Sequence, residues 1–152
     1  MDNIEYAGFW LRFGAALIDV VVMMLVFSLP LTLIYGAAYW ESDTVVHGFW
    51  DVILSYIAPF VATIWFWLRF LGTPGKMVLK LRIVDASSGE KMGVGQAVGR
   101  YFAYIVSIVP LCLGFIWIAF DKRKQGWHDK LARTVVIRDV GKVPVQPEVA
   151  DQ

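Results

Sequence analysis

Three apolar blocks, each about as long as a lipid bilayer is thick, constrain this chain more than any other feature. They cover residues 13–34, 52–71 and 101–120. A helix of roughly 20 apolar residues crosses the hydrocarbon core of a membrane, whereas buried strands have about four to eight residues. The composition agrees, because 58% of the 152 residues are hydrophobic and only 18% are charged. The sequence therefore predicts an all-α membrane protein.

The basic residues predict how the first two blocks are oriented. No Lys or Arg occurs in residues 13–68, whereas six occur in residues 69–100. Short loops rich in Lys and Arg favour the cytoplasmic side of a membrane. We therefore expect residues 69–100 to be cytoplasmic, the acidic loop 40–51 to be outside, and both blocks to span. This places the N-terminus in the cytoplasm.

The first block is expected to be retained in the protein. No basic residue precedes Arg12, the apolar run is longer than that of a typical signal peptide, and Asp19 lies within it. Signal peptides have a basic start and an uninterrupted apolar centre.

Pro110 and Gly114 interrupt the third block. A straight span would place the seven basic residues of segment 122–142 outside, against the charge rule. A break at proline returns the C-terminus to the cytoplasm, so we predict a broken or re-entrant hairpin in preference to a kinked span. Two expected strands, at residues 77–85 and 133–140, favour the hairpin because paired strands must lie on one side of the membrane.

The expected architecture is one membrane domain over residues 6–138. It has two spanning helices, a broken third segment that begins as a surface helix near Val94, and a small cytoplasmic two-stranded β element. Residues 1–5 and 141–152 are expected to be flexible, since chain ends without packing partners rarely stay ordered.

Two charged residues stand in the otherwise apolar first block. Arg12 and Asp19 are seven positions apart, which places them on one helix face about 10 Å apart along the axis. Arg12 is close enough to the helix end to extend to the interface. An ionised Asp19 costs at least about 2.5 kcal/mol in a bilayer. We therefore expect Asp19 to be protonated, paired with a cation or open to a water-filled cavity.

A second charged group follows the third block. Three consecutive basic residues are expected to attract anionic lipid headgroups, at roughly 1 kcal/mol each: Lys122, Arg123 and Lys124. His128 and Asp129 are adjacent and lie on different faces of a helix, which disfavours a direct pair between them. Asp129 is instead a candidate partner for Arg12.

Four stretches, in this order, resemble the RDD family of small bacterial membrane proteins: YAGFWLRFGAALID, LGTPGKMVLKLRIVDASSGE, GRYFAY and FDKRKQGWHDKLARTVVIRD. The likeness covers nearly the whole chain. The family is named after an arginine near the start of the first helix, an aspartate in its middle and a further aspartate. By this resemblance Arg12 and Asp19 take the first two positions, and Asp129 takes the third, with Asp121 as the alternative.

The resemblance implies a bacterial inner membrane and transport, with sodium or proton exchange as one activity. In a transporter, Asp19 is expected to bind and release a proton or small cation, Arg12 to modulate its charge and Asp129, with His128 and Asp121 nearby, to form the inner mouth. Three apolar blocks cannot easily enclose a path, so a homo-oligomer or a membrane partner protein is expected. The alternative is a non-transporting accessory or scaffold subunit.

Other signals are weak. The stretch GTPGK at residues 72–76 lacks the spacing of a phosphate-binding loop. His47 and His128 are the two histidines and are expected on opposite sides of the membrane, and Cys112 is the single cysteine, so neither a metal cluster nor an intramolecular disulfide is expected. We therefore expect no enzymatic activity, no cofactor and no nucleic-acid partner; the bilayer is the expected surrounding.

Overall fold

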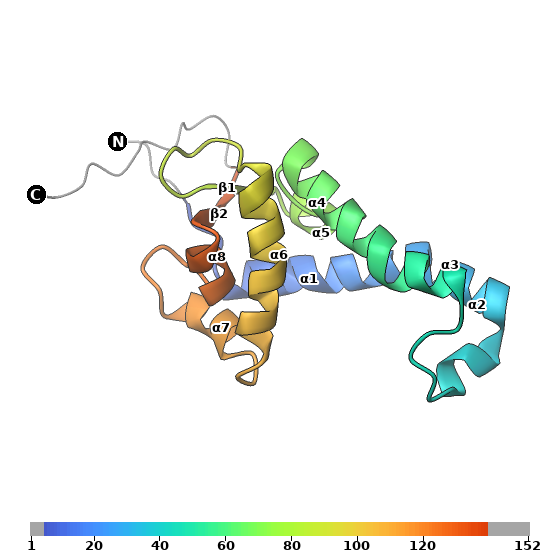
Figure 1. The fold of residues 1–152 in the computed structure, drawn as a ribbon. Helices are drawn as coiled ribbons and strands as arrows, with labels where there is room; N and C mark the ends of the chain where they lie inside the picture. Colours follow the sequence, from blue (N-terminus) through green and yellow to red (C-terminus); the bar gives the residue numbers. More distant parts are fainter. Residues whose placement is uncertain (1–4, 140–152) are drawn as a thin grey trace, which may run out of the picture.

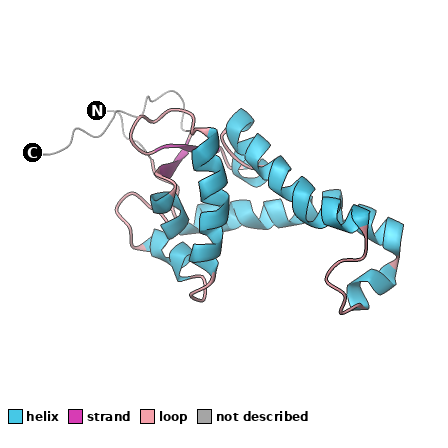
Figure 2. Cartoon of the chain, in the orientation of Figure 1, coloured by secondary structure: helices cyan, strands magenta, loops and turns pink. Residues whose placement is uncertain are grey.

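The computed structural model describes residues 5–139 as two long helices joined at one end, with a head of shorter elements at the other (Figure 1). The expectation of flexible ends at residues 1–4 and 141–152 lies outside the described residues. Glu5 is held in place, because its carbonyl oxygen accepts the backbone N–H of Arg138 at 2.8 Å. Helices dominate the chain and the strands are confined to the head (Figure 2).

The first apolar block forms one continuous helix, Phe9–Tyr35, of 27 residues. It comprises α1 (Phe9–Met23), a π-helical turn (Met24–Ser28) and α2 (Leu29–Tyr35). At 1.5 Å per residue the helix rises about 40 Å, enough to cross a bilayer. Pro30 has no N–H to donate within the helix, and the widened turn that precedes it accommodates the missing hydrogen bond.

The second block repeats this design. A loop with a short 3-10 turn (Ala37–Glu41) leads into α3 (Phe49–Val52), a second π-helical turn (Ile53–Ile57) and α4 (Ala58–Phe70), with Pro59 placed as Pro30 is in the first helix. Together α3 to α4 rise about 33 Å. The two π-helical turns contact each other across the hairpin. Both predicted spans are confirmed as helices of spanning length and composition.

The third block is broken, as predicted. It forms α6 (Val94–Ile108), which begins at the expected residue, and α7 (Leu113–Ile116) with a 3-10 turn (Trp117–Ala119). The two halves are bent by 107° around Pro110. By itself α6 rises about 22 Å, too little to cross a hydrocarbon core of about 30 Å.

Two features hold this bend. Leu111 and Cys112 adopt left-handed backbone conformations, with φ of 53° and 61°, which reverses the chain at a cost that the surrounding packing must offset. A Cβ on Gly114 would lie 2.5 Å from Ser107 Cα. Only glycine therefore allows α7 to pack this closely on α6.

The head contains a two-stranded antiparallel sheet. β1 (Leu81–Asp85) pairs with β2 (Thr134–Arg138), from Leu81 opposite Arg138 to Asp85 opposite Thr134, and Tyr6 bridges to Ile137 on the other edge of β2. The sheet confirms the predicted β element. The second predicted strand, 133–140, is shorter than expected, and its last residue lies outside the described part of the chain.

The predicted start of the first strand, at Met77, is wrong. Residues 74–78 instead form the short helix α5 (Pro74–Val78). Proline at the first helical position fits this start because its missing N–H is not needed there. The alternation of apolar and basic residues that suggests a strand here belongs partly to this helix.

A small core holds the head to the first helix. α5 packs on α1, and α8 (Trp127–Leu131) packs on α6. The buried apolar residues come from α1, α4, both strands, α6 and the loops between them: Ala7, Ala15, Trp67, Leu81, Ile83, Met92, Ala97 and Val136. The long helices, by contrast, expose large apolar side chains such as Leu25 and Leu33. That pattern is typical of helices that face lipid.

Candidate functional site

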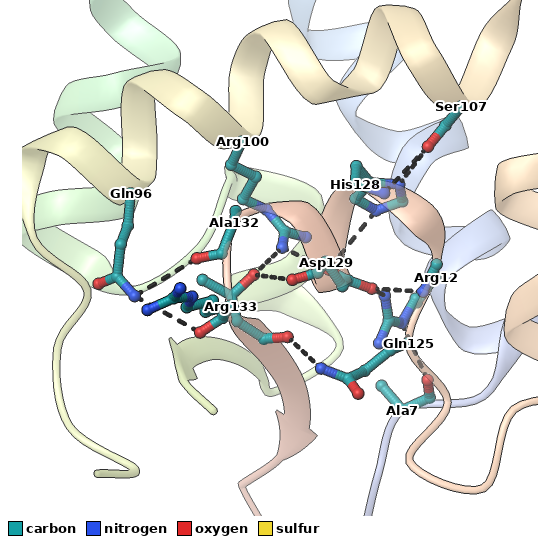
Figure 3. A network of polar contacts seen from close by, with 12 residues as sticks. Ala7, Arg12, Gln96, Arg100, Ser107, Gln125, His128, Asp129, Ala132 and Arg133 are labelled. Atoms are coloured by element: carbon teal, nitrogen blue, oxygen red, sulfur yellow. Dashed lines mark hydrogen bonds and ion pairs between the residues drawn. The ribbon is translucent and has the colours of Figure 1, made fainter. Parts of the chain in front are cut away.

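A buried aspartate lies between two arginines in the head (Figure 3). Asp129 of α8 has no exposed surface. Its Oδ2 accepts a hydrogen bond from Arg12 Nη1, and its Oδ1 accepts one from Arg100 Nη1. The backbone N–H of Gly126, just before α8, also donates to Oδ2 at 2.9 Å. The predicted pairing of Asp129 with Arg12 is therefore present, with a second arginine added.

Arg12 ties the start of α1 to the segment before α8. Its Nε donates to the carbonyl of Ala7 at 2.9 Å, and its Nη2 donates to the carbonyl of Lys124 at 2.5 Å. The planar guanidinium thus contacts three acceptors from three segments, which a lysine ammonium reaches far less well. Arg12 is 8% exposed, so it is a buried structural cation more than an interfacial anchor.

Arg100 is the site residue that sequence analysis missed. It is fully buried in α6, and its guanidinium lies over the rings of Trp67 and Tyr104 at 5.5 and 5.7 Å from their centroids. Its Nη1 also donates to Thr134 Oγ1 in β2. One signal was available: Arg100 stands in the stretch GRYFAY and shares a helix face with the small buried residues of α6, Ala97, Ala103 and Ser107.

His128 lies beside this network between two aromatic rings. The ring centroids of Tyr104 and Phe115 are 4.4 and 4.8 Å from that of His128. Ser107 Oγ accepts the His128 backbone N–H at 3.1 Å and lies 3.1 Å from Nδ1. Ser107 can thus donate its own proton to Nδ1, which favours the tautomer protonated at Nε2. Nε2 then faces Asp129 Oδ1 at 3.5 Å. The two side chains are therefore closer than expected for adjacent residues, which lie on different faces of a helix.

The charges of this network determine how it titrates. Burial lowers the pKa of His128 to about 3; the Asp129 carboxylate opposes the shift and the charges of Arg100 and Arg12 add to it. Burial alone would raise the pKa of Asp129, but the charges of Arg100 and Arg12 outweigh it and hold that pKa well below its usual value. At neutral pH the network therefore contains two arginine cations, one carboxylate and a neutral imidazole.

Asp19 is separate from this network. Its Oδ2 accepts a hydrogen bond from Thr73 Oγ1 at 2.5 Å, and its Oδ1 accepts one from the backbone N–H of Gly75 at 2.7 Å. A carboxylate from α1 thus caps the first turn of α5, where backbone N–H groups have no helical acceptor. Asp19 and Arg12 share a helix face but form no ion pair among the described residues, because each has a partner elsewhere.

Gly75 makes this contact possible. A Cβ at this position would lie 2.0 Å from the carbonyl oxygen of Ala15 and 3.0 Å from Asp19 Cγ. The backbones of α1 and α5 are therefore in direct contact. The stretch at residues 72–76 is the place where α5 docks on the first span.

Two cavities meet at Asp19. The larger, of about 640 Å³, extends from Tyr39 and Ser55 near the closed end of the helix hairpin to Lys76 at the head. The smaller, of about 320 Å³, lies on the other side, against Thr73 and α4. Asp19 is thus the carboxylate that lines both of these cavities within residues 5–139.

Asp121 and the basic run next to it organise the loop before α8. Asp121 accepts the backbone N–H groups of Arg123 and Gln125 and pairs with Lys130 Nζ at 2.5 Å. Arg123 Nη2 donates to the carbonyl of Ala86 at 2.8 Å. Asp129, and not Asp121, is thus the aspartate that meets Arg12.

The three basic residues expected to bind lipid differ from one another. Lys122 is exposed. Arg123 is engaged with the loop after β1, and Lys124 Nζ donates to the carbonyl of Ala119 at 3.3 Å. Lipid binding by these side chains remains a prediction, and it is best supported for Lys122.

A second buried carboxylate, Asp51, lies at the closed end of the helix hairpin and was not singled out from the sequence. Its Oδ1 accepts hydrogen bonds from Tyr39 OH at 2.5 Å and Ser55 Oγ at 2.7 Å, and its Oδ2 accepts the His47 N–H at 2.8 Å. The hydrogen bond to Asp51 raises the pKa of Tyr39. The sequence contains one indication of this cluster, because His47, Asp51 and Ser55 are spaced four residues apart.

The chain has relatives among known bacterial proteins. Residues 6–133 match the model of the RDD family. The chain is 34% identical over 149 residues to the uncharacterized protein YxaI of Bacillus subtilis strain 168, covering 86% of this chain and 96% of the relative. It is 30% identical over 152 residues to the uncharacterized membrane protein YteJ of the same organism, covering 88% and 82%. No solved structure matches the chain.

Proposed function

Because this chain belongs to the RDD family of membrane proteins, we propose that it transports an ion or small solute, with Asp19 as the group that exchanges a proton or small cation. The observation that carries the proposal is the cavity of about 640 Å³ that Asp19 lines. It follows the two long helices over much of their length. Ionisable residues inside membrane helices usually serve such a path.

The two hydrogen bonds that Asp19 accepts leave its carboxylate able to bind a proton or small cation. Each carboxylate oxygen accepts one hydrogen bond, from Thr73 and Gly75, and each retains a further lone pair. Those lone pairs are available to a proton or cation in the cavity. The π-helical turns beside the cavity support the same role, since such turns are frequent at functional sites.

Arg12 and Asp129 have a different role in this proposal from the one that the sequence suggests. Asp129 is fully buried and engaged by both Arg12 and Arg100, so it is poorly suited to gate an inner mouth. We assign the pair to holding α1, α6 and α8 together, which keeps α5 and its contact with Asp19 in place.

We further propose that the head is cytoplasmic, that both chain ends lie on that side of a bacterial inner membrane, and that transport requires a homo-oligomer. The basic residues gathered in the head support the orientation. An oligomer would cover the exposed apolar faces that line an open cavity. A cysteine introduced at exposed Ser88, in a Cys112→Ala background, should react only from the cytoplasmic side; labelling from outside would contradict this orientation.

The test is flux in liposomes that hold purified protein and a pH-sensitive dye. With an imposed sodium or potassium gradient, the wild-type protein should dissipate or build a proton gradient, and Asp19→Asn should slow this at least about tenfold. The matched control is Asp43→Asn, in the exposed loop at the closed end of the hairpin. Equal rates for Asp19→Asn and wild type would rule out the role of Asp19.

A scaffold function is the second candidate, and one observation favours it. Both acidic residues of the family pattern already have protein donors, since Asp19 caps α5 and Asp129 joins two arginines. In that case Asp19→Asn or Arg12→Ala should lower the thermal stability of the assembly, and wild-type protein should show no flux for any cation. Unchanged stability of both variants would argue against a scaffold.

A further inference from the structure

A third cavity lies between α1, α6 and α7; Asp19 does not line it, but it shares Ala16, Lys76 and Tyr104 with the larger of the two cavities that Asp19 lines. Its volume is about 400 Å³, within the range of roughly 300–1,000 Å³ typical of small-molecule sites. Three cationic side chains line it: Arg12, Lys76 and Arg100. No Asp or Glu of residues 5–139 is among its lining residues.

The positive charge around this cavity is only partly compensated. Arg12 and Arg100 share the single carboxylate of Asp129. Lys76 is 9% exposed, its Nζ has a long contact of 3.4 Å with Thr73 Oγ1, and no ion pair joins it to a carboxylate of the described chain. Arg100 Nε and Nη2 are buried and have no hydrogen-bond acceptor within residues 5–139. A buried cation without a counter-charge is costly, so the cavity favours an anion.

Most of the other residues that line the cavity are apolar, with Tyr104 and His128 as polar members. Phe9, Phe13, Phe115, Ile116 and Ile118 line it. Phe13 and Ile116 are 47% and 43% exposed, on surfaces that would face lipid in a membrane. Cys112, at the bend between α6 and α7, lines the cavity and is also exposed. A ligand that matches both kinds of lining residue carries an oxyanion and an acyl chain.

We propose that this cavity binds the anionic phosphate headgroup of a membrane lipid, with Lys76 and Arg100 as its cationic ligands and the acyl chains directed out past Phe13 and Ile116. The site differs from the basic run at residues 122–124, because its cations Lys76 and Arg100 are buried, whereas Lys122 is exposed. It is independent of transport and of the role of Asp19.

Cys112 supplies a direct test, because it is the single cysteine of the chain and lines the site. The protein is placed in phosphatidylcholine nanodiscs, and the rate of Cys112 alkylation by a maleimide is followed by mass spectrometry. Dioctanoyl phosphatidic acid should slow alkylation at least about fivefold and in a saturable way. Dioctanoylglycerol, which has the same chains without the phosphate, and inorganic phosphate should each leave the rate within about twofold.

Substitution of Lys76, one of the cations that line the cavity, provides a second test. Lys76→Gln should raise the concentration of phosphatidic acid needed for half-protection at least about tenfold, while Lys80→Gln, an exposed lysine outside the cavity, should leave it unchanged. Equal protection by dioctanoylglycerol, equal protection by inorganic phosphate, absence of protection, or an unchanged Lys76→Gln variant would each overturn the proposal. The wild-type arm needs no substitution and stands even if Lys76→Gln does not fold.

Discussion

At the scale of single residues, the head depends on one carboxylate that joins distant parts of the chain. Asp129 contacts Arg12, 117 positions away, and Arg100, 29 positions away. Burying three ionised groups is costly, and complete pairing and hydrogen bonding are needed to offset that cost. The helices α1, α6 and α8 must therefore pack together, because each of the three buried charges needs the others as partners.

We expect Asp129→Asn to destabilise the protein by about 3–5 kcal/mol, because it leaves two buried arginines without a counter-charge. The matched variant Asp121→Asn removes a carboxylate that pairs with Lys130, whose side chain is 45% exposed, and should cost about 1 kcal/mol or less. Thermal unfolding in detergent, followed by tryptophan fluorescence, compares the two. Equal losses would show that the buried pair is not what holds the head together.

At the scale of elements, two close contacts position the short helices. Gly75 allows α5 to touch the backbone of α1, and Gly114 allows α7 to fold back on α6. Both contacts depend on the absence of a side chain. The helices α5 and α7 are too short to be stable alone, so these contacts determine their positions, and Asp19 adds a cap to α5.

We expect Gly75→Ala to destabilise the protein by more than about 2 kcal/mol, because the new methyl group overlaps the Ala15 carbonyl and forces α5 away from α1. The control is Gly99→Ala in α6, where nothing lies within 4 Å of the added Cβ. That change should be neutral or stabilise the helix by about 0.5–1 kcal/mol. The free energies of unfolding of both variants in one detergent are the measurement, and similar values would contradict the close contact.

At the scale of the whole molecule, a head of short elements is joined to a hairpin of two long helices (Figure 1). The long helices expose large apolar side chains, whereas the head buries ionisable groups, Arg100, His128 and Asp129, next to its apolar core. The stability of the head should therefore depend on pH in a way that the hairpin does not share. His128 and Asp129 both belong to α8 and both have lowered pKa values, and they determine whether acid raises or lowers the stability of the head.

We expect acid to destabilise the head. Between pH 6.5 and about 3 the unfolded chain binds a proton at His128 that the folded chain does not, so stability present above pH 6.5 is lost as the pH falls through this window. From pH 7 to pH 5 the loss is up to about 2 kcal/mol, at 1.36 kcal/mol per pH unit below the unfolded pKa. Protonation of Asp129 in the unfolded chain continues the loss below 3.8, the ordinary pKa of an aspartate, because the fold lowers this pKa.

His128→Gln provides the control for this pH dependence. The variant lacks the titrating ring, so its thermal midpoint should change less between pH 7 and pH 5 than that of the wild-type protein. A wild-type midpoint that is constant over this interval, or one that rises on acidification, would contradict the burial of a neutral His128.

The sequence by itself determined the features that depend on local composition. The length of the apolar blocks predicted two spans, Pro110 and Gly114 predicted the break in the third, and the β-branched run ending near Arg138 predicted a strand. These conclusions hold because a helix of given length and polarity has few alternatives in a bilayer. The resemblance to the RDD family selected Arg12, Asp19 and Asp129 as the residues to follow.

Only the tertiary structure decided which charges meet. Arg100 stands at the edge of an apolar block as Arg69 does, and only the small residues on its helix face hint that it is buried; the packing of α6 on α8 and Trp67 buries it. Asp19 and Arg12 share a helix face, yet the docking of α5 through Gly75 gives Asp19 its own donors. Ion pairing over such separations depends on which elements pack together, and that is a property of the whole fold.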